Sequence, residues 1–112
     1  MPVDACSVTG YKLKMAIRSF RERRLQRLFA DDDATSIKGL NSEWIDKLRN
    51  RFLAIDNATE LAQLGLIPGW RLHQHTAGKW KGFWSIDVSG NWRLFFRFED
   101  GDAFDLSLDD PH

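Results

Sequence analysis

The fold is decided by residues 83–98, which run FWSIDVSGNWRLFFRF. Apolar and polar side chains alternate over residues 84–88 and again over residues 92–98, and a Ser-Gly-Asn turn separates the two segments. A period of two is typical of a β-strand with one buried face. We therefore expect two antiparallel strands that share one apolar face, formed by Trp84, Ile86, Val88, Trp92, Leu94, Phe96 and Phe98.

The flanking sequence extends this sheet. Residues 70–73 alternate in the same way, with Trp70 and Leu72 on one side and Arg71 and His73 on the other. Asp100-Gly101 is a short hairpin turn, and it precedes a last apolar row of Phe104, Leu106 and Leu108. Residues 17–20 are expected to form a short first strand.

The residues before the sheet follow a helical period instead. Leu25, Leu28 and Phe29 form one apolar stripe within residues 21–31. A second helix has an apolar face of Ile45, Leu48, Phe52 and Ile55, with Asn41 or Ser42 as its cap, and Thr59 is expected to cap a short helical turn through Leu64. Two helices followed by antiparallel strands predict an α+β domain with the helices on one side of the sheet.

Length and composition agree with a single domain. The chain has 112 residues, 43% of them hydrophobic, which is enough for one core without a disulfide or a metal staple. Cys6 is the single cysteine, no apolar run is long enough to span a membrane, and the start lacks the apolar segment of a secretory signal. We expect a cytoplasmic protein with a flexible N-terminal extension at residues 1–14 and one domain at residues 15–112.

The net charge of zero hides a segregation of charge along the chain. Residues 12–27 are basic apart from Glu22, residues 71–97 are basic apart from Asp87, and the tail from Glu99 onward is acidic with no Lys or Arg. This pattern allows a local basic surface for nucleic acid but also fits ordinary solvated faces.

The strand period gathers polar residues on the sheet face that the helices leave free. These are Arg71, His73, Ser85, Asp87, Arg93, Arg97, Asp105 and Ser107. An imidazole with guanidinium groups and carboxylates can cleave RNA without a metal, because the ribose 2′-hydroxyl is the nucleophile and arginine matches phosphate. Exposed Phe83, Phe95 or Trp80 could stack on bases.

Other interpretations of this face stay open. It can be only the solvated face of a half-buried sheet. His73 and His75, two residues apart, could hold a metal, but no cysteine or carboxylate stands beside them at ligand spacing, so we expect no metal. Ser85 lacks a His-Asp companion in any nucleophile motif.

Several ordered blocks of the sequence resemble HigB-type toxins of the RelE/ParE superfamily, from Met15 to His112. They are IRSF at 17–20, LAIDNATEL at 53–61, PGWRLHQH at 68–75, KGFWSI at 81–86, GNWRLFFRF at 90–98 and DGDAFD at 100–105. The resemblance implies a RelE-like fold with helices packed on a curved sheet. It also implies the toxin of a type II toxin–antitoxin system: a metal-independent mRNA endonuclease that acts at the ribosomal A site, inhibits translation and is neutralised by a HigA-like helix-turn-helix antitoxin.

The resemblance also implies roles for single residues. The family's active-site histidine falls on His73, its phosphate-stabilising arginine on Arg93, and the acidic residue and histidine of its closing Asp-Tyr-His on Asp110 and His112. The basic residues expected to contact ribosome and RNA are Arg71, Lys79, Lys81 and Arg97, and Arg97 is also expected to help Arg93 hold phosphate.

Two departures from the family pattern bear on activity. Pro111 replaces the tyrosine of the closing tripeptide, and the lysine after the strand histidine is missing; Lys79 and Lys81 in the same loop are the candidates to take its place. The alternative prediction is a non-catalytic toxin-like binder, either a ParE-like gyrase inhibitor or an inactive homologue that binds antitoxin.

Overall fold

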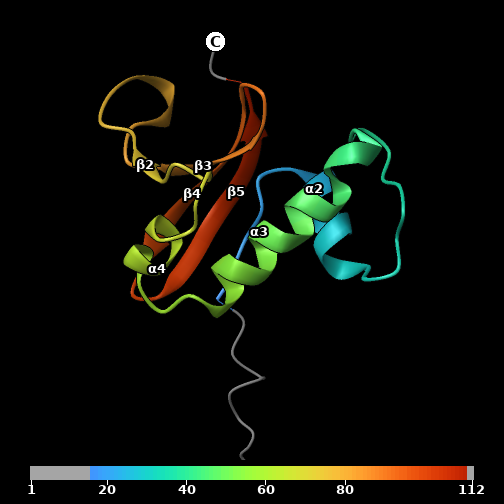
Figure 1. The fold of residues 1–112 in the computed structure, drawn as a ribbon, viewed down its shortest axis with the longest axis horizontal. Coiled ribbons are helices and arrows are strands. Elements are labelled where there is room, and N and C mark those ends of the chain that lie inside the picture. The colour runs from blue at the N-terminus through green and yellow to red at the C-terminus, as the bar shows by residue number, and fades with distance from the viewer. Residues whose placement is uncertain (1–15, 111–112) are drawn as a thin grey trace, which may run out of the picture.

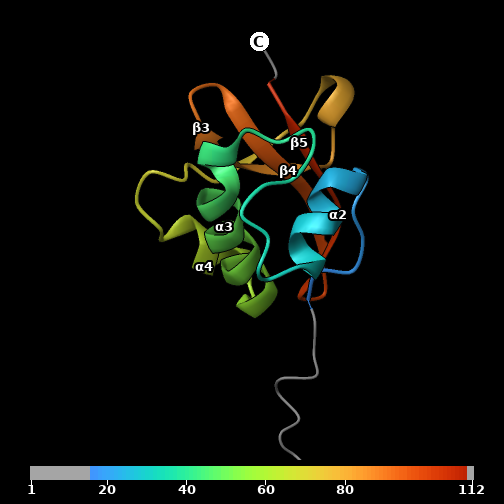
Figure 2. The same cartoon turned by 90° about the vertical axis from the view of Figure 1, so that its right-hand side faces the viewer.

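The computed structural model describes residues 16–110, which form two layers (Figure 1). One layer is an antiparallel sheet in the order β2 (His73–Gln74), β3 (Trp84–Ser89), β4 (Trp92–Glu99) and β5 (Asp102–Asp109). The other layer is formed by α2 (Arg23–Ala30) and α3 (Ile45–Asn57), which lie side by side on one face of that sheet (Figures 1 and 2). The predicted α+β fold is confirmed.

The segment before α2 lies against the outer edge of β5. Ile17 and Phe20 form two isolated parallel bridges with Ala103 and Leu106. The predicted first strand is therefore present as an extended edge segment that pairs at two points only. Because it runs parallel to β5, the chain can turn directly from this edge into α2.

Polar side chains cap the N-termini of two of the helical segments. Asn41 is the cap in front of the second helical segment, where its side chain accepts a hydrogen bond from the Glu43 amide at 2.9 Å and starts the 3₁₀ turn Ser42–Trp44 that leads into α3. The short helix α4 (Leu61–Gly65) is capped by Glu60 rather than by the expected Thr59. Glu60 forms a reciprocal capping box with Gln63, and the same Gln63 side chain also accepts from the Thr59 amide.

The core lies between the helices and the inner face of the sheet. The predicted apolar rows of the helices and of the sheet pack against each other there, and most of their buried side chains have no solvent exposure. Buried in this core are Leu25, Leu28, Ile45, Leu48, Phe52, Ile55, Ile86, Val88, Leu94, Phe96, Ala103, Leu106 and Leu108.

Phe104 does not join the core, contrary to the predicted last row. Between the pairs Phe95–Ser107 and Arg97–Phe104, β5 has one residue more than β4, which is a β-bulge. Asp105 takes a left-handed backbone conformation at this point, with φ of 58°. The bulge reverses the facing of the residues before it, so Ala103 points into the core and Phe104 lies beneath the Arg97 guanidinium on the outer face.

The predicted strand at residues 70–73 is also shorter than expected. Only His73 and Gln74 pair with β3, opposite Ser85 and Trp84. Arg71 has φ of 50°, a conformation that a strand cannot contain, although the Trp70 carbonyl still accepts from the Asp87 amide at 2.7 Å. The kink at Arg71 thus separates the hydrogen bond at Trp70 from the two residue pairs that β2 forms with β3.

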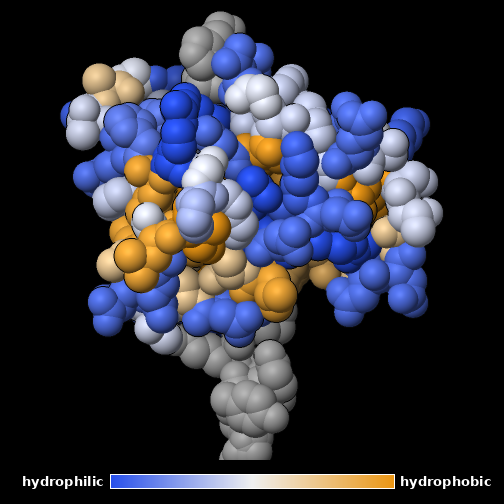
Figure 3. Space-filling view, viewed as in Figure 1, coloured by the Kyte–Doolittle hydropathy of each residue, from blue (hydrophilic) through white to orange (hydrophobic). Residues whose placement is uncertain are grey.

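The surface in the view of Figure 3 is mostly hydrophilic over α2 and α3, with hydrophobic side chains gathered over the α4 region. Leu66, directly after α4, is 81% exposed. None of the helices within residues 16–110 is long and apolar enough to cross a membrane.

Candidate active site

The register of the sheet brings the predicted polar residues into two neighbouring rows on its outer face. His73 pairs with Ser85, Ser85 with Phe95, and Phe95 with Ser107. In the adjacent row, Asp87 pairs with Arg93 and Arg93 with Asp109. Residues from four strands thus lie together because antiparallel partners stand directly opposite each other.

Asp87 organises the two arginines of this face. Its Oδ2 lies 2.9 Å from Nε of Arg71, and its Oδ1 lies 3.5 Å from Nε of Arg93. The Arg71 side chain is 68% exposed, whereas that of Arg93 is 18% exposed. Arg93 is therefore the more fixed of the two cations, and Arg71 extends toward solvent from the kinked backbone.

His73 lies beside these cations and is open to solvent. A pocket of about 370 Å³ is lined by Arg71, Leu72, His73 and Arg93. The lining is mostly polar, and its two guanidinium groups and one imidazole are the chemical groups expected around a phosphodiester. The structure thus brings together His73, Arg93 and Arg71, as the strand period predicted.

A second imidazole, His75, belongs to the same cluster. Its Nε2 lies 2.8 Å from the Ser85 hydroxyl, and its ring meets that of His73 edge-on at a centroid distance of 4.7 Å. Burial lowers the pKa of His75, and the nearby charges of His73 and Arg93 lower that pKa further. From the sequence, His75 was considered only as a possible metal ligand, although its spacing of two from His73 already predicted that both rings lie on one face.

The aromatic residues expected to be exposed on this face are largely covered. Phe95 is 0% exposed and Trp80 is 8% exposed, because the two rings stack on each other with centroids 4.1 Å apart. Trp80 comes from the 3₁₀ turn Gly78–Trp80, in the loop that folds back over β4. Ser85 and Ser107, predicted to be solvated, are buried in the same row. The loop that carries Trp80 therefore covers one side of the outer face.

Arg51 supports the cluster from the helix layer and was not among the predicted site residues. It is a buried residue whose Nε donates to the Asp87 carbonyl at 2.7 Å, and its guanidinium lies 4.6 Å from the centre of the Trp70 ring. Burial lowers its pKa, and Asp87 partly offsets this by raising it. The available signal was its position in the apolar stripe, three residues after Leu48 and four before Ile55.

The other predicted residues lie around this cluster or outside the described range. Arg97 is four residues from Arg93 along β4 and is engaged by Asp105 at 3.0 Å and Glu99 at 3.2 Å, so the structure does not place it in the pocket. Lys79 lies 3.4 Å from Asp109 at the end of β5, and Lys81 is exposed in the same loop. Asp110 directly follows Asp109, whereas Pro111 and His112 lie outside the described residues.

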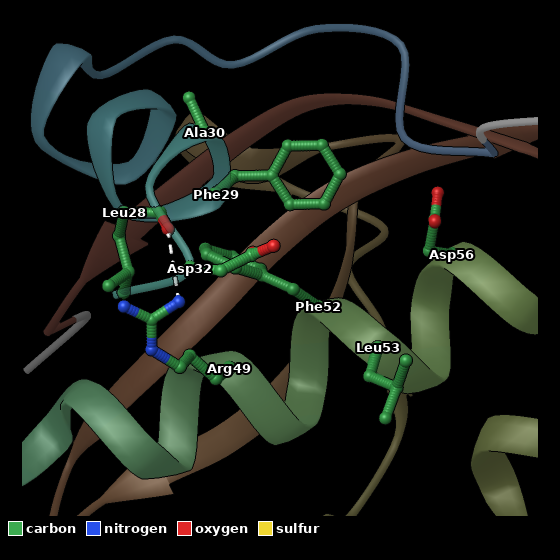
Figure 4. Close-up of a pocket in the computed structure, with 8 residues that line it drawn as sticks. All are labelled: Leu28, Phe29, Ala30, Asp32, Arg49, Phe52, Leu53 and Asp56. Atoms are coloured by element: carbon green, nitrogen blue, oxygen red, sulfur yellow. Dashed lines mark hydrogen bonds between the residues drawn. The ribbon is translucent and has the colours of Figure 1, made fainter. Parts of the chain in front are cut away.

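A larger hollow lies elsewhere, between α2 and α3 (Figure 4). It has a volume of about 750 Å³ and a mainly apolar lining that includes Leu28, Phe29, Phe52 and Leu53. Its one cation, Arg49, donates to the carbonyl oxygens of Leu28, Asp31 and Ala34 and so closes the end of α2. Two carboxylates, those of Asp32 and Asp56, also line the hollow, whereas the imidazoles of His73 and His75 lie on the outer face of the sheet.

Among residues 16–110 no group of three or more His, Cys, Asp or Glu side chains could hold a metal ion. His73 and His75 therefore lack a third ligand within the described part of the chain. The two imidazoles instead face each other, and that of His75 also contacts the Ser85 hydroxyl.

Comparison with known proteins gives a consistent result. Residues 18–112 match the sequence model of a family described as the RelE-like toxin of type II toxin–antitoxin system HigB. The chain is 38% identical over 96 residues to endoribonuclease HigB of Proteus vulgaris, an alignment that covers 86% of this chain and 99% of the relative. It is 31% identical over 93 residues to toxin HigB-1 of Vibrio cholerae, covering 83% of this chain and 94% of that toxin. The family match includes all four strands and the whole pocket on the outer face.

Proposed function

The chain belongs to the HigB family of RelE-like toxins of type II toxin–antitoxin systems, and on that premise we propose that it is an endoribonuclease that cuts mRNA on the ribosome. The observation that carries this proposal is the pocket in which His73, Arg93 and Arg71 meet. The Proteus vulgaris relative, which bears the name endoribonuclease, supports the same activity.

The reaction follows from the groups around the pocket. A base takes the proton of a ribose 2′-hydroxyl, the 2′-oxygen attacks phosphorus, and the bond from phosphorus to the 5′-oxygen breaks as that oxygen receives a proton. The products are a 2′,3′-cyclic phosphate and a 5′-hydroxyl. These steps need two proton-transfer groups and a fixed cation, and they need no metal.

We assign these roles to the residues on the outer face. His73 transfers one proton, and Asp110 or His112 at the end of the chain handles the other. Arg93, held by Asp87, stabilises the charge that develops on the phosphate oxygens. Arg71 adds a second, more mobile cation at the mouth of the pocket. We leave Arg97 outside this assignment, since its guanidinium is engaged by Asp105 and Glu99 and does not line the pocket.

Docking on the ribosome requires contacts with RNA phosphates outside the pocket. Arg71 and Lys79 have side chains 68% and 71% exposed, and Lys81 is exposed beside them. Exposed cations of this kind bind phosphate without reading the sequence. Arg71 lines the pocket, and Lys79 contacts Asp109, the strand partner of Arg93, so a ribosomal A site that presents mRNA would place the scissile bond near His73.

The family implies an antitoxin partner and an RNA substrate. We propose that the antitoxin is a HigA-like helix-turn-helix protein and that the toxin acts in the cytoplasm, where its ribosomal target lies. A small helix-turn-helix protein encoded directly beside this chain would support the first part. Co-purification of the two proteins would test their association.

The test is growth arrest after induction in a host without the antitoxin, together with mapping of transcript ends. We expect the parent chain to stop growth and leave cleaved transcripts, and His73→Ala and Arg93→Ala to lose both effects. Arg97→Ala is the matched control on the same strand and should retain most of the activity. If His73→Ala and Arg93→Ala both stay as toxic as the parent, the assignment is wrong. Intact transcripts with DNA damage would instead indicate a gyrase inhibitor.

A further inference from the structure

His75 stands between the exposed histidine of the pocket and the covered part of the sheet face. On one side its ring meets His73 edge-on, at 4.7 Å between centroids and 88° between planes. On the other side it packs against Phe95 at 5.1 Å. His75 therefore connects a solvent-exposed imidazole to one of the most deeply buried rings in the protein.

Both the backbone and the side chain of His75 are held in place. Its amide donates to the Phe83 carbonyl at 2.8 Å, and its carbonyl accepts from the Gly82 amide at 2.9 Å. Its Nε2 lies 2.8 Å from the hydroxyl of Ser85, a residue that is 0% exposed. A buried hydroxyl needs a hydrogen-bond partner, so this bond fixes the rotation of the His75 ring.

His73 has much less support of its own. It lies in a two-residue strand next to the kink at Arg71, and it is exposed. An exposed side chain keeps its rotamer freedom unless a neighbouring group restricts it. The edge-on contact with His75 provides that restriction, because the His75 ring cannot move away without breaking its bond to Ser85.

We infer that His75 is a positioning residue for His73 and that Ser85 is the hydroxyl that locks it. This inference rests on the proposed function, since it takes His73 as a proton-transfer group. His75 does not itself need to exchange a proton with RNA. It acts through the orientation of the neighbouring ring.

The charges around His75 agree with this role. The groups that face it are His73 in β2, two residues before it, Ser85 on β3, and Arg93 and Phe95 on β4. Burial lowers the pKa of His75, and electrostatic interactions with His73 and Arg93 lower that pKa further. At neutral pH it is therefore an uncharged ring, which supports His73 without adding a like charge to a site that must bind phosphate.

The main test is cleavage of ribosome-bound mRNA by purified full-length variants at a temperature where each is folded. His75→Ala should lower kcat about 10²-fold and leave KM unchanged, because a misplacement of about 1 Å costs a factor of this order. Ser85→Ala should lower kcat about 10-fold. Ser107→Ala is the matched control, because it removes a buried hydroxyl from the same cross-strand row. The Ser107 hydroxyl donates to the Asp105 carbonyl and not to a histidine, so the kcat of this variant should stay within about 2-fold of the parent.

His75→Phe separates positioning from proton transfer. It keeps a ring between His73 and Phe95 but cannot carry a proton, so we expect it to recover a large part of the kcat lost in His75→Ala. The inference is overturned if His75→Phe is as slow as His75→Ala. It is equally overturned if His75→Ala or Ser85→Ala keeps the parental kcat.

A second measurement does not depend on cleavage. Imidazole NMR of the full chain should show contacts between the His73 and His75 ring protons in the parent, and these should weaken in Ser85→Ala but not in Ser107→Ala. If the parent cuts no RNA, the proposed function fails while this measurement still decides the ring contact. Unchanged His73 signals in Ser85→Ala and His75→Ala would overturn the inference even if the parent is an active nuclease.

Discussion

Replacement of Phe95 tests whether the outer face of the sheet is built as the structure shows. Phe95 is 0% exposed, stacks on Trp80 with an interplanar angle of 14°, and contacts His75. Phe95→Ala removes the ring that anchors the loop at residues 76–82 to β4. Phe95→Leu is the matched control, since it keeps most of the buried volume without the aromatic face.

The structure sets the size of the effect. Truncation of a fully buried phenylalanine costs about 3–5 kcal/mol, and loss of an aromatic pair adds to the cost. We expect Phe95→Ala to lower the free energy of unfolding by about 4 kcal/mol, which is a fall in Tm of about 15–30 °C for a domain of this size. Phe95→Leu should cost about 1–2 kcal/mol, because it keeps most of the buried volume but loses the stack on Trp80.

The assay combines urea denaturation with hydrogen exchange. Within the loop, the Gly82 amide donates to the His75 carbonyl and the Phe83 amide to the Trp80 carbonyl, each at 2.9 Å. Both amides should lose protection in Phe95→Ala and keep it in Phe95→Leu. A free energy of unfolding of Phe95→Ala within about 0.5 kcal/mol of the parent, which is the cost at an exposed site, with the loop amides still protected, would contradict this packing.

Three further predictions concern the groups beneath and beside the pocket. Arg51→Met should lower the free energy of unfolding by about 2–4 kcal/mol, because the Asp87 carbonyl loses its hydrogen-bond donor and the Trp70 ring loses its cation. Calorimetry measures this difference, and a loss below about 0.5 kcal/mol would contradict the prediction. Asp87→Asn should slow cleavage about 10-fold, because Arg93 loses the carboxylate that holds it. Asp105→Asn, which disturbs the ion pair of Arg97 instead, should leave the rate unchanged. Equal rates in both variants would exclude a role for the Asp87–Arg93 ion pair. Because the pKa of His75 is lowered in the folded chain, the unfolded chain binds more protons below about pH 6.5, so stability should fall as pH drops through the window between the lowered pKa and that value. His75→Gln should remove this part of the pH dependence in denaturation curves between about pH 5 and 8, and a parent whose stability does not change over that range would contradict the assignment.

The sheet could be predicted from local sequence because its two long strands bury one face. Residues 83–98 alternate with a period of two, and Ile86, Leu94 and Phe96 occupy the core as that pattern requires. The same rule placed His73 and Arg93 on the opposite face, where they line one pocket. In a sheet with one buried face, the alternation of side chains fixes the strand register, so knowing which face each residue occupies also predicted which side chains are neighbours across strands.

The errors arise where the backbone leaves that period. Arg71 and Asp105 both adopt positive φ values, and neither position holds a glycine that would have signalled the turn. The first conformation shortens β2, and the second turns Phe104 out of the core. Non-glycine residues take this conformation because tertiary contacts hold them there; the Asp105 amide, for example, donates a hydrogen bond to the Ser19 hydroxyl oxygen at 2.8 Å.

The second kind of error came from contacts between distant segments. Nothing local to Trp80 or Phe95 indicates that the loop folds back and stacks one ring on the other, so both looked available to bases. Arg51 is different, since a charged residue within the apolar stripe of α3 was visible in the sequence. Its partner, the carbonyl of Asp87, is 36 residues away and could be found only in the folded chain.

The most direct test of the central claim is the chemistry of the cut RNA ends. Translating ribosomes are given an mRNA with ribose at the cut site, or the same mRNA with one 2′-O-methyl ribose there, together with the purified chain. We predict that the first is cut to a 2′,3′-cyclic phosphate and a 5′-hydroxyl that a kinase can label directly, that the second stays intact, and that His73→Ala cuts neither. Equal cleavage of both messages, or fragments that carry a 5′-phosphate, would contradict the account.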